Sequence, residues 1–187
     1  MEEQVVKFLS TVEKLKTTLR HNWTTTGRQE SVAEHTWRVA LFFIIVQDLY
    51  KYDVDVVKVL KMIIVHDIPE LVAGDIPAFE SKRKKKKMNE ILSAKKVFRQ
   101  LPSPLNKEYF DLFKEFEEGV SPEAKLAEAL EKIESQLQHL DSGPTYWSDK
   151  EKGAHMLNYP NKALKRLDDK RIQKIWDIVK EKIDKLT

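Results

Sequence analysis

Hydrophobic positions recur every three or four residues along almost the whole chain, which is the spacing of helices with one buried face. The first stripe covers residues 5–19, and the next two stretches, at about 32–50 and 56–65, are apolar on nearly every side. No segment alternates cleanly with the period of two that marks a half-buried strand. The pattern therefore predicts an all-α fold, with the second and third helices at its centre.

Helix-capping signals agree with these stripes. Ser31 followed by Glu34 forms a capping box before the second helix, and Asp53 or Asp55 can cap the third. Ser121-Pro122 is a good helix start, because proline at the first helical position loses no hydrogen bond. Further stripes predict shorter helices at 91–98 and 109–116, a long helix from 122 to about 140, and a last one at about 162–185.

Composition narrows the class of protein. The 187 residues suit one domain, and 41% hydrophobic with 34% charged residues argues against disorder. Cysteine is absent, which excludes disulfides, thiolate metal sites and a cysteine nucleophile, and suits a reducing cytoplasm. The longest apolar run, Val39–Val46, is far too short to cross a membrane, and the acidic Met1–Gln4 does not resemble a secretory signal. We expect a cytoplasmic protein without a membrane partner.

The net charge of +3 comes from one run, residues 82–87, which carries six basic side chains. The remaining 27 basic residues are outnumbered by 30 acidic ones, so a nucleic-acid partner is not expected. The run is either an electrostatic collar that attracts nucleotides or a solvated surface segment. No aromatic residues interrupt it to stack on bases.

Two of the five histidines, His35 and His66, fall in the apolar central helices, where ionisable groups are costly unless they are paired or bind metal. Asp67 directly follows His66. Two imidazoles and a carboxylate suit Mn, Fe, Co, Ni or Zn better than Ca. Spacing alone leaves two interpretations open, because buried histidines are also common as hydrogen-bonded core residues.

Several motifs in order carry a more specific signal. Residues 31–35 (SVAEH), 65–77 (VHDIPELVAGDIP), 121–126 (SPEAKL), 129–134 (ALEKIE) and 136–139 (QLQH) resemble the HD-domain metal-dependent phosphohydrolases, closest to their 5′-deoxynucleotidase-like branch. The resemblance covers roughly residues 5–145. It implies a helical bundle of about six to eight helices around a single divalent-metal site, with a C-terminal helix at about 162–185 packed on it, all in one domain over 1–187.

The resemblance also implies the ligands of one divalent ion (Co, Mn, Fe, Ni, Zn or Mg). These are His35, His66, Asp67 and a distal carboxylate on a later helix. The family has Asp at that distal position within an Asp-Lys-Leu/Ile-Glu pattern, whereas this chain has Glu131. Glutamate also offers oxygen ligands but is one methylene longer. The alternative is that Glu131 is a solvated carboxylate beside Lys132.

The same resemblance implies roles for four further residues. Glu70 would position or deprotonate the attacking water, and Asp75 would contact the substrate or assist proton transfer. Arg20 would bind the phosphate, for which a guanidinium fork is well shaped, and Trp23 would pack near the sugar and exclude a 2′-hydroxyl. The alternatives are that Glu70 is a carboxylate at a helix start, that Arg20 is solvated and that Trp23 is a core residue.

The activity implied is release of phosphate from deoxyribonucleoside 5′-monophosphates by a homodimer. The alternatives are a deoxynucleoside triphosphate hydrolase of the same superfamily, which can use the same metal site, and a nucleotide-binding protein with a degraded site. The second alternative is motivated by Glu131.

Overall fold

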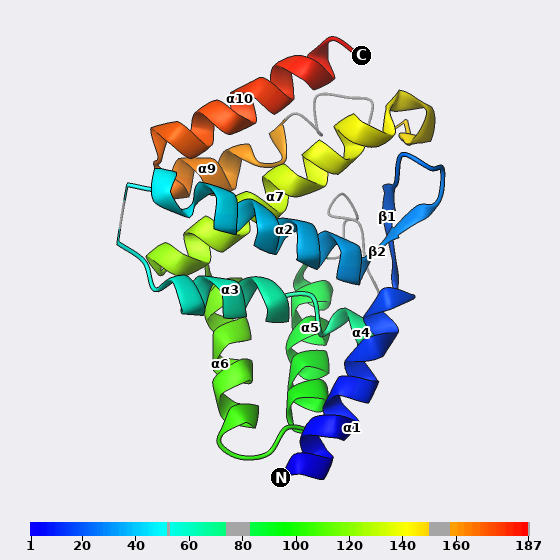
Figure 1. The fold of residues 1–187 in the computed structure, drawn as a ribbon, viewed down its shortest axis with the longest axis vertical. Helices are drawn as coiled ribbons and strands as arrows, with labels where there is room; N and C mark the ends of the chain where they lie inside the picture. The colour runs from blue at the N-terminus through cyan, green and yellow to red at the C-terminus, as the bar shows by residue number, and fades with distance from the viewer. Residues whose placement is uncertain (52, 74–82, 150–157, 187) are drawn as a thin grey trace.

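Helices make up most of the computed structural model, which describes residues 1–51, 53–73, 83–149 and 158–186 (Figure 1). The all-α prediction is confirmed. No helix within these ranges is both long and apolar enough to cross a membrane. The elements in chain order are α1 (Glu2–Val12), η1 (Glu13–Lys16), β1 (Leu19–Trp23), β2 (Gln29–Ser31), α2 (Val32–Val46), η2 (Gln47–Leu49), α3 (Val56–Val65), α4 (Glu70–Ala73), α5 (Arg83–Phe98), α6 (Leu105–Glu118), α7 (Pro122–Ser142), η3 (Pro144–Tyr146), α9 (Asn161–Leu167) and α10 (Lys170–Asp184).

The long helix α7 lies at the centre of the fold and contacts α2, α3, α6, α9, α10 and β1 (Figure 1). Its predicted core positions Leu126, Leu130 and Ile133 are fully buried. The helix begins as predicted, because the Ser121 side chain accepts a hydrogen bond from the Ala124 amide. The helices α2 and α3 and the strand β1, which contribute to the site, therefore all pack on this one helix.

The expectation that α2 and α3 lie at the centre of the fold is wrong. Val39 and Phe43 of α2 are fully buried, but Trp37 and Ile45 keep 64% and 66% of their surfaces exposed. Each helix packs on α7 and on its neighbour with one face only. A sequence that is apolar all round does not reveal which face is covered, and α7 rather than these helices occupies the centre.

The predicted caps of the two helices are confirmed. Ser31 and Glu34 form the capping box at the start of α2. At α3, the cap is Asp55, whose side chain accepts a hydrogen bond from the Lys58 amide. The chain then turns at Ile68-Pro69 and restarts in α4, as the proline predicts.

A small antiparallel hairpin replaces the end of the predicted first helix. The helix stops before Leu19, and β1 pairs with β2 through a turn in which Gly27 has a φ of 79°. In β1 the buried residues Arg20 and Asn22 alternate with half-buried His21 and Trp23. The alternation is between polar residues, so a search for hydrophobic period two does not detect it.

The predicted last helix is divided in two. Asp168 adopts a left-handed conformation with φ 53° and ends α9, and the next residue caps α10. Both helices pack on α7. Of the basic run, Arg83–Lys87 form the first turns of α5, and Lys82 lies outside the described residues.

Candidate metal centre

Three predicted ligands converge from separate places in the chain. His35 lies in the first turn of α2, His66 ends α3, and Asp67 follows it. Oδ2 of Asp67 lies 3.2 Å from Nε2 of His66 and 3.8 Å from Nε2 of His35. One candidate ligand atom from each residue lies within 4.8 Å of the other two, so a single ion can bind all three side chains.

The outer nitrogen of each histidine ring is held by an acceptor. Nδ1 of His66 donates to the carbonyl of Ile63 at 2.7 Å, and Nδ1 of His35 donates to the carboxylate of Glu134. A carbonyl cannot donate a proton, so Nδ1 of His66 carries the hydrogen, and a carboxylate at Glu134 imposes the same tautomer on His35. The Nε2 atoms are buried without a hydrogen-bond partner and face the Asp67 carboxylate. Two nitrogen lone pairs around a carboxylate oxygen form an arrangement that a divalent cation stabilises, so these residues fit a metal.

The charges around Asp67 keep it ionised. Burial alone would raise the pKa of Asp67, but the adjacent His66 and Arg20 lower it well below its usual value. Burial alone would lower the pKa of His66, whereas the Asp67 carboxylate raises it. An ionised, buried carboxylate is the form that binds a cation.

Glu131 lies beside this cluster rather than within it. Its Oε2 is 3.2 Å from Nζ of Lys132, which also approaches Glu128 at 3.9 Å. Burial alone would raise the pKa of Glu131, yet Lys132 and the two histidines lower it. The carboxylate is therefore ionised close to the histidines, while its nearest partner is the neighbouring lysine.

Of the two predicted catalytic carboxylates, Glu70 and Asp75, the structure describes only Glu70. Glu70 begins α4, is half-buried, and donates its backbone amide to the carbonyl of Asp67 at 3.0 Å. The structure therefore places it one turn from the metal ligands. Asp75 lies outside the described residues.

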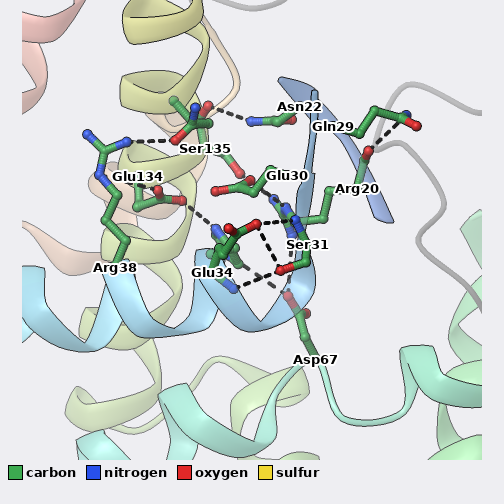
Figure 2. A network of polar contacts seen from close by, with 12 residues as sticks. Arg20, Asn22, Gln29, Glu30, Ser31, Glu34, Arg38, Asp67, Glu134 and Ser135 are labelled. Atoms are coloured by element: carbon green, nitrogen blue, oxygen red, sulfur yellow. Dashed lines mark hydrogen bonds and ion pairs between the residues drawn. The ribbon is translucent and has the colours of Figure 1, made fainter. Parts of the chain in front are cut away.

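Of the two predicted substrate residues, Arg20 reaches the centre (Figure 2). Its Nη1 lies 3.3 Å from Oδ2 of Asp67, and its side chain is 5% exposed. Trp23, at the other end of β1, stacks on Tyr146 with ring centroids 5.2 Å apart, and its carbonyl accepts a hydrogen bond from Gln138. A solvated arginine is thus excluded, and Trp23 has an aromatic neighbour against which it packs.

Three residues beside Arg20 and His35 were not assigned a role from the sequence. Glu30, Glu134 and Ser135 are all buried and contact either Arg20 or His35 (Figure 2). Burial and the nearby Glu134 carboxylate raise the pKa of Glu30 to about 7. One signal for Glu134 was present in the sequence: it follows Glu131 by three positions and so shares its helix face.

Comparison with known proteins places this geometry in a family. A family model of the HD domain matches residues 12–176. The chain is 32% identical over 137 residues to human 5′-deoxynucleotidase HDDC2, covering 72% of this chain and 66% of that protein. It is 32% identical over 137 residues to 5′-deoxynucleotidase hdd1 of Schizosaccharomyces pombe, covering 70% and 68%. The chain thus spans just under two thirds of the human protein's length.

A solved structure agrees over nearly the whole chain. The crystal structure of a predicted metal-dependent phosphohydrolase from Magnetospirillum magnetotacticum superposes with a TM-score of 0.86 and 25% identity, covering 98% of this chain and 92% of that one. The fold, the paired histidines with their aspartate and the family match agree. The chain belongs to the HD domain family.

Proposed function

We propose that this protein is a metal-dependent 5′-nucleotidase that releases phosphate from deoxyribonucleoside 5′-monophosphates. The observation that carries the proposal is the approach of Arg20 to within 3.3 Å of Asp67, because it puts a phosphate-binding cation beside a metal-binding triad. The curated relatives named as 5′-deoxynucleotidases support the substrate class.

His35, His66 and Asp67 would hold one divalent transition-metal ion, with Glu131 as a fourth ligand. A bound ion would polarise a phosphate oxygen and lower the pKa of a water molecule. To serve as a ligand, Glu131 would have to turn its carboxylate away from Lys132, which lies 3.2 Å from it.

Side chains of the protein would then bind the phosphate and transfer the protons. Arg20 anchors the phosphate, whose negative charge it matches. Glu70 accepts a proton from the attacking water as the new P–O bond forms and the bond to the 5′-oxygen breaks. Asp75 assists delivery of a proton to the departing 5′-oxygen, so that a nucleoside and inorganic phosphate leave. Trp23 packs beside the sugar and disfavours a 2′-hydroxyl.

A phosphate-release screen tests the function. The full chain, loaded with Mn²⁺, is assayed on paired ribo- and deoxyribonucleoside mono-, di- and triphosphates. We expect the deoxynucleoside monophosphates to be hydrolysed fastest. The preference over ribonucleotides should be about 100-fold, since a pocket rejects an added hydroxyl by shape only to that extent, and Trp23→Ala should narrow it.

The other outcomes separate the alternatives. A preference for triphosphates would indicate the triphosphate hydrolase. Nucleotide binding without phosphate release would indicate a binding protein in which Glu131 no longer supports catalysis. Equal rates on ribo- and deoxynucleotides would show that Trp23 does not exclude a 2′-hydroxyl.

We further propose that the protein is a homodimer formed through the exposed face of α2. Trp37, Leu41, Ile44 and Ile45 lie on one side of this helix and are all exposed. Four large apolar side chains in one stripe are unusual on a free surface. Light scattering on the purified chain should give twice the mass of one chain, and Ile45→Asp should give monomers. A monomeric wild-type protein would contradict this.

Domain organisation and location complete the proposal. We propose that residues 1–187 form one domain, because α9 and α10 pack on α7, so thermal unfolding should occur in one transition.

A chain without cysteine needs no oxidising compartment to fold, and we propose that it acts in the cytoplasm. Fractionation of cells that produce the tagged full chain tests this.

A further inference from the structure

Glu30 is a buried acid that the proposed reaction does not use. It lies on β2, and only 2% of its surface is exposed to solvent. Its Oε2 is 3.2 Å from Nε of Arg20. The arginine is buried almost as completely. A buried charge is costly unless a partner compensates it, so each side chain of this pair depends on the other.

Each nitrogen of the Arg20 guanidinium meets a different element (Figure 2). Nε faces Glu30 on β2, and Nη2 donates to Oγ of Ser135 on α7 at 2.8 Å. Nη1 faces Asp67 of the metal centre at 3.3 Å. The hydrogen bond from Nη2 to Ser135 and the ion pair of Nε with Glu30 restrict the orientation of the group, with Nη1 toward the candidate ligands.

The strands that carry the pair are themselves fixed. Nδ2 of Asn22 donates to the carbonyl of Ser135 at 3.0 Å, which ties β1 to α7. Nε2 of Gln29 donates to the carbonyl of Arg20 at 3.1 Å, which ties β2 to β1. The carboxylate and the hydroxyl that hold the guanidinium therefore belong to one rigid frame.

We propose that Glu30, assisted by Ser135, is a positioning residue that holds the Arg20 guanidinium in the orientation needed to bind the substrate phosphate. This rests on the proposed function. An arginine side chain loses much rotamer freedom when it is immobilised, and a group that is already ordered binds more tightly because that loss precedes binding. Glu30 does not touch the substrate and acts only through Arg20.

A second metal ion is the competing explanation for this cluster. Glu30, His35 and Glu134 also offer ligand atoms within 4.8 Å of one another. Both carboxylates, however, already have a cation of the protein itself: Arg20 at 3.2 Å from Glu30, and Arg38, whose Nε lies 3.7 Å from Oε1 of Glu134. The geometry thus favours guanidinium positioning over a second metal.

The test is a double-mutant cycle read out by phosphate binding. Wild type, Glu30→Gln, Arg20→Ala and the double variant are loaded with Mn²⁺ and titrated calorimetrically with inorganic phosphate. The titrations are made at about pH 8.5, above the pKa of about 7 of Glu30, so that Glu30→Gln keeps the shape and removes a charge. The dissociation constant should then rise about tenfold in the Arg20 background. In the Arg20→Ala background the same change should have no further effect. KM for the monophosphate should rise more than kcat falls.

Two further variants separate positioning from folding. Ser135→Ala should weaken phosphate binding in the same direction by a smaller factor, which keeps the proposal testable if Glu30→Gln folds poorly. Asp169→Asn is the matched control: this buried carboxylate accepts hydrogen bonds from backbone amides at the start of α10. We expect it to lower Tm and leave phosphate binding unchanged. Metal content, measured in every variant, should stay at one ion for each chain.

Several outcomes would overturn the inference. Glu30→Gln with a lower Tm and an unchanged phosphate dissociation constant would make Glu30 purely structural. An equal effect in both Arg20 backgrounds would show that it acts independently of Arg20. Loss of a second bound ion in Glu30→Gln would favour the metal explanation. Failure of the proposed function is distinct: Arg20→Ala would then leave phosphate binding unchanged, whatever Glu30 does.

Discussion

Helix α2 has two sides that break the usual rule of burial in opposite ways. One side carries His35, a polar residue that is fully buried, and the other carries Trp37, Leu41, Ile44 and Ile45, apolar residues that are exposed. At 100° per residue, the buried face that includes His35 and Val39 is centred nearly opposite the exposed stripe. The buried polar side is stabilised by specific partners, whereas the exposed apolar side chains lie outside the hydrophobic core formed by the described residues.

The comparison teaches which observation bears on which function. A buried histidine with one nitrogen fixed and the other aimed at a carboxylate indicates a bound cation. An exposed apolar stripe indicates a surface that another molecule covers. The first can be tested by measuring bound metal, and the second by measuring the mass of the protein in solution.

The largest effect is expected from removing the metal or its ligands. His66→Ala and Asp67→Ala should abolish metal binding and activity together, because each removes one of three converging donors. Chelation of the wild-type protein should do the same, and added Mn²⁺ should restore the rate. Metal is measured by mass spectrometry and activity by phosphate release. Full activity in a chelated, metal-free sample would contradict the mechanism.

Next is Glu70, which the proposed mechanism uses as a proton acceptor and not as a ligand. Glu70→Ala should keep the metal and the fold but lower kcat by about 10²–10⁴-fold. Metal content and the thermal transition serve as controls in the same sample. If kcat stays near normal in the metal-loaded variant, Glu70 is only the first residue of α4.

A smaller effect is expected at Glu131, where the chain departs from the family pattern. Glu131→Ala should weaken metal binding by about 10–100-fold, and Glu131→Asp should retain or raise the affinity. Glu128→Ala is the matched control, since that carboxylate also contacts Lys132 and lies one turn earlier on α7. Identical metal dissociation constants for wild type and both Glu131 variants would show that Glu131 is not a ligand.

The smallest effect on folding is expected on the exposed side of α2. Ile45→Asp should change the free energy of unfolding of the monomer by less than about 0.5 kcal/mol, because the side chain already faces solvent. Val39→Ala on the buried side should cost about 1–3 kcal/mol. Urea titration of both variants, under conditions in which wild type is also monomeric, measures the difference. Equal costs would mean that the two faces are not distinct in the folded chain.

The convergence of His35, His66 and Asp67 could be predicted because several motifs in order resemble those of a known family. A histidine in an apolar helix is conspicuous, but spacing alone does not distinguish a metal ligand from a hydrogen-bonded core histidine. The glutamates are different. Four glutamates look alike in the sequence but have different partners in the fold: Glu30 pairs with Arg20, Glu34 with Arg28 and the Ser31 amide, Glu131 with Lys132, and Glu134 with His35.

The contacts of these glutamates depend on tertiary placement. Glu30 reaches Arg20 only because a hairpin folds β2 against β1, and that hairpin has no hydrophobic alternation to reveal it. Ser135 meets Arg20 across 115 residues of sequence. Local periodicity carries no information on such a contact, so these residues could be found only once the fold was known.

The attachment of the hairpin to α7 also determines how the chain opens. A two-stranded hairpin is marginally stable by itself. Here, Asn22, Gln138 and Arg20 each link β1 to α7 through a side-chain hydrogen bond. Local fraying of β1 would therefore break contacts to the central helix, so its amides should exchange with deuterium about as slowly as those of α7. The segment that carries the proposed phosphate anchor should then open only when the whole domain unfolds.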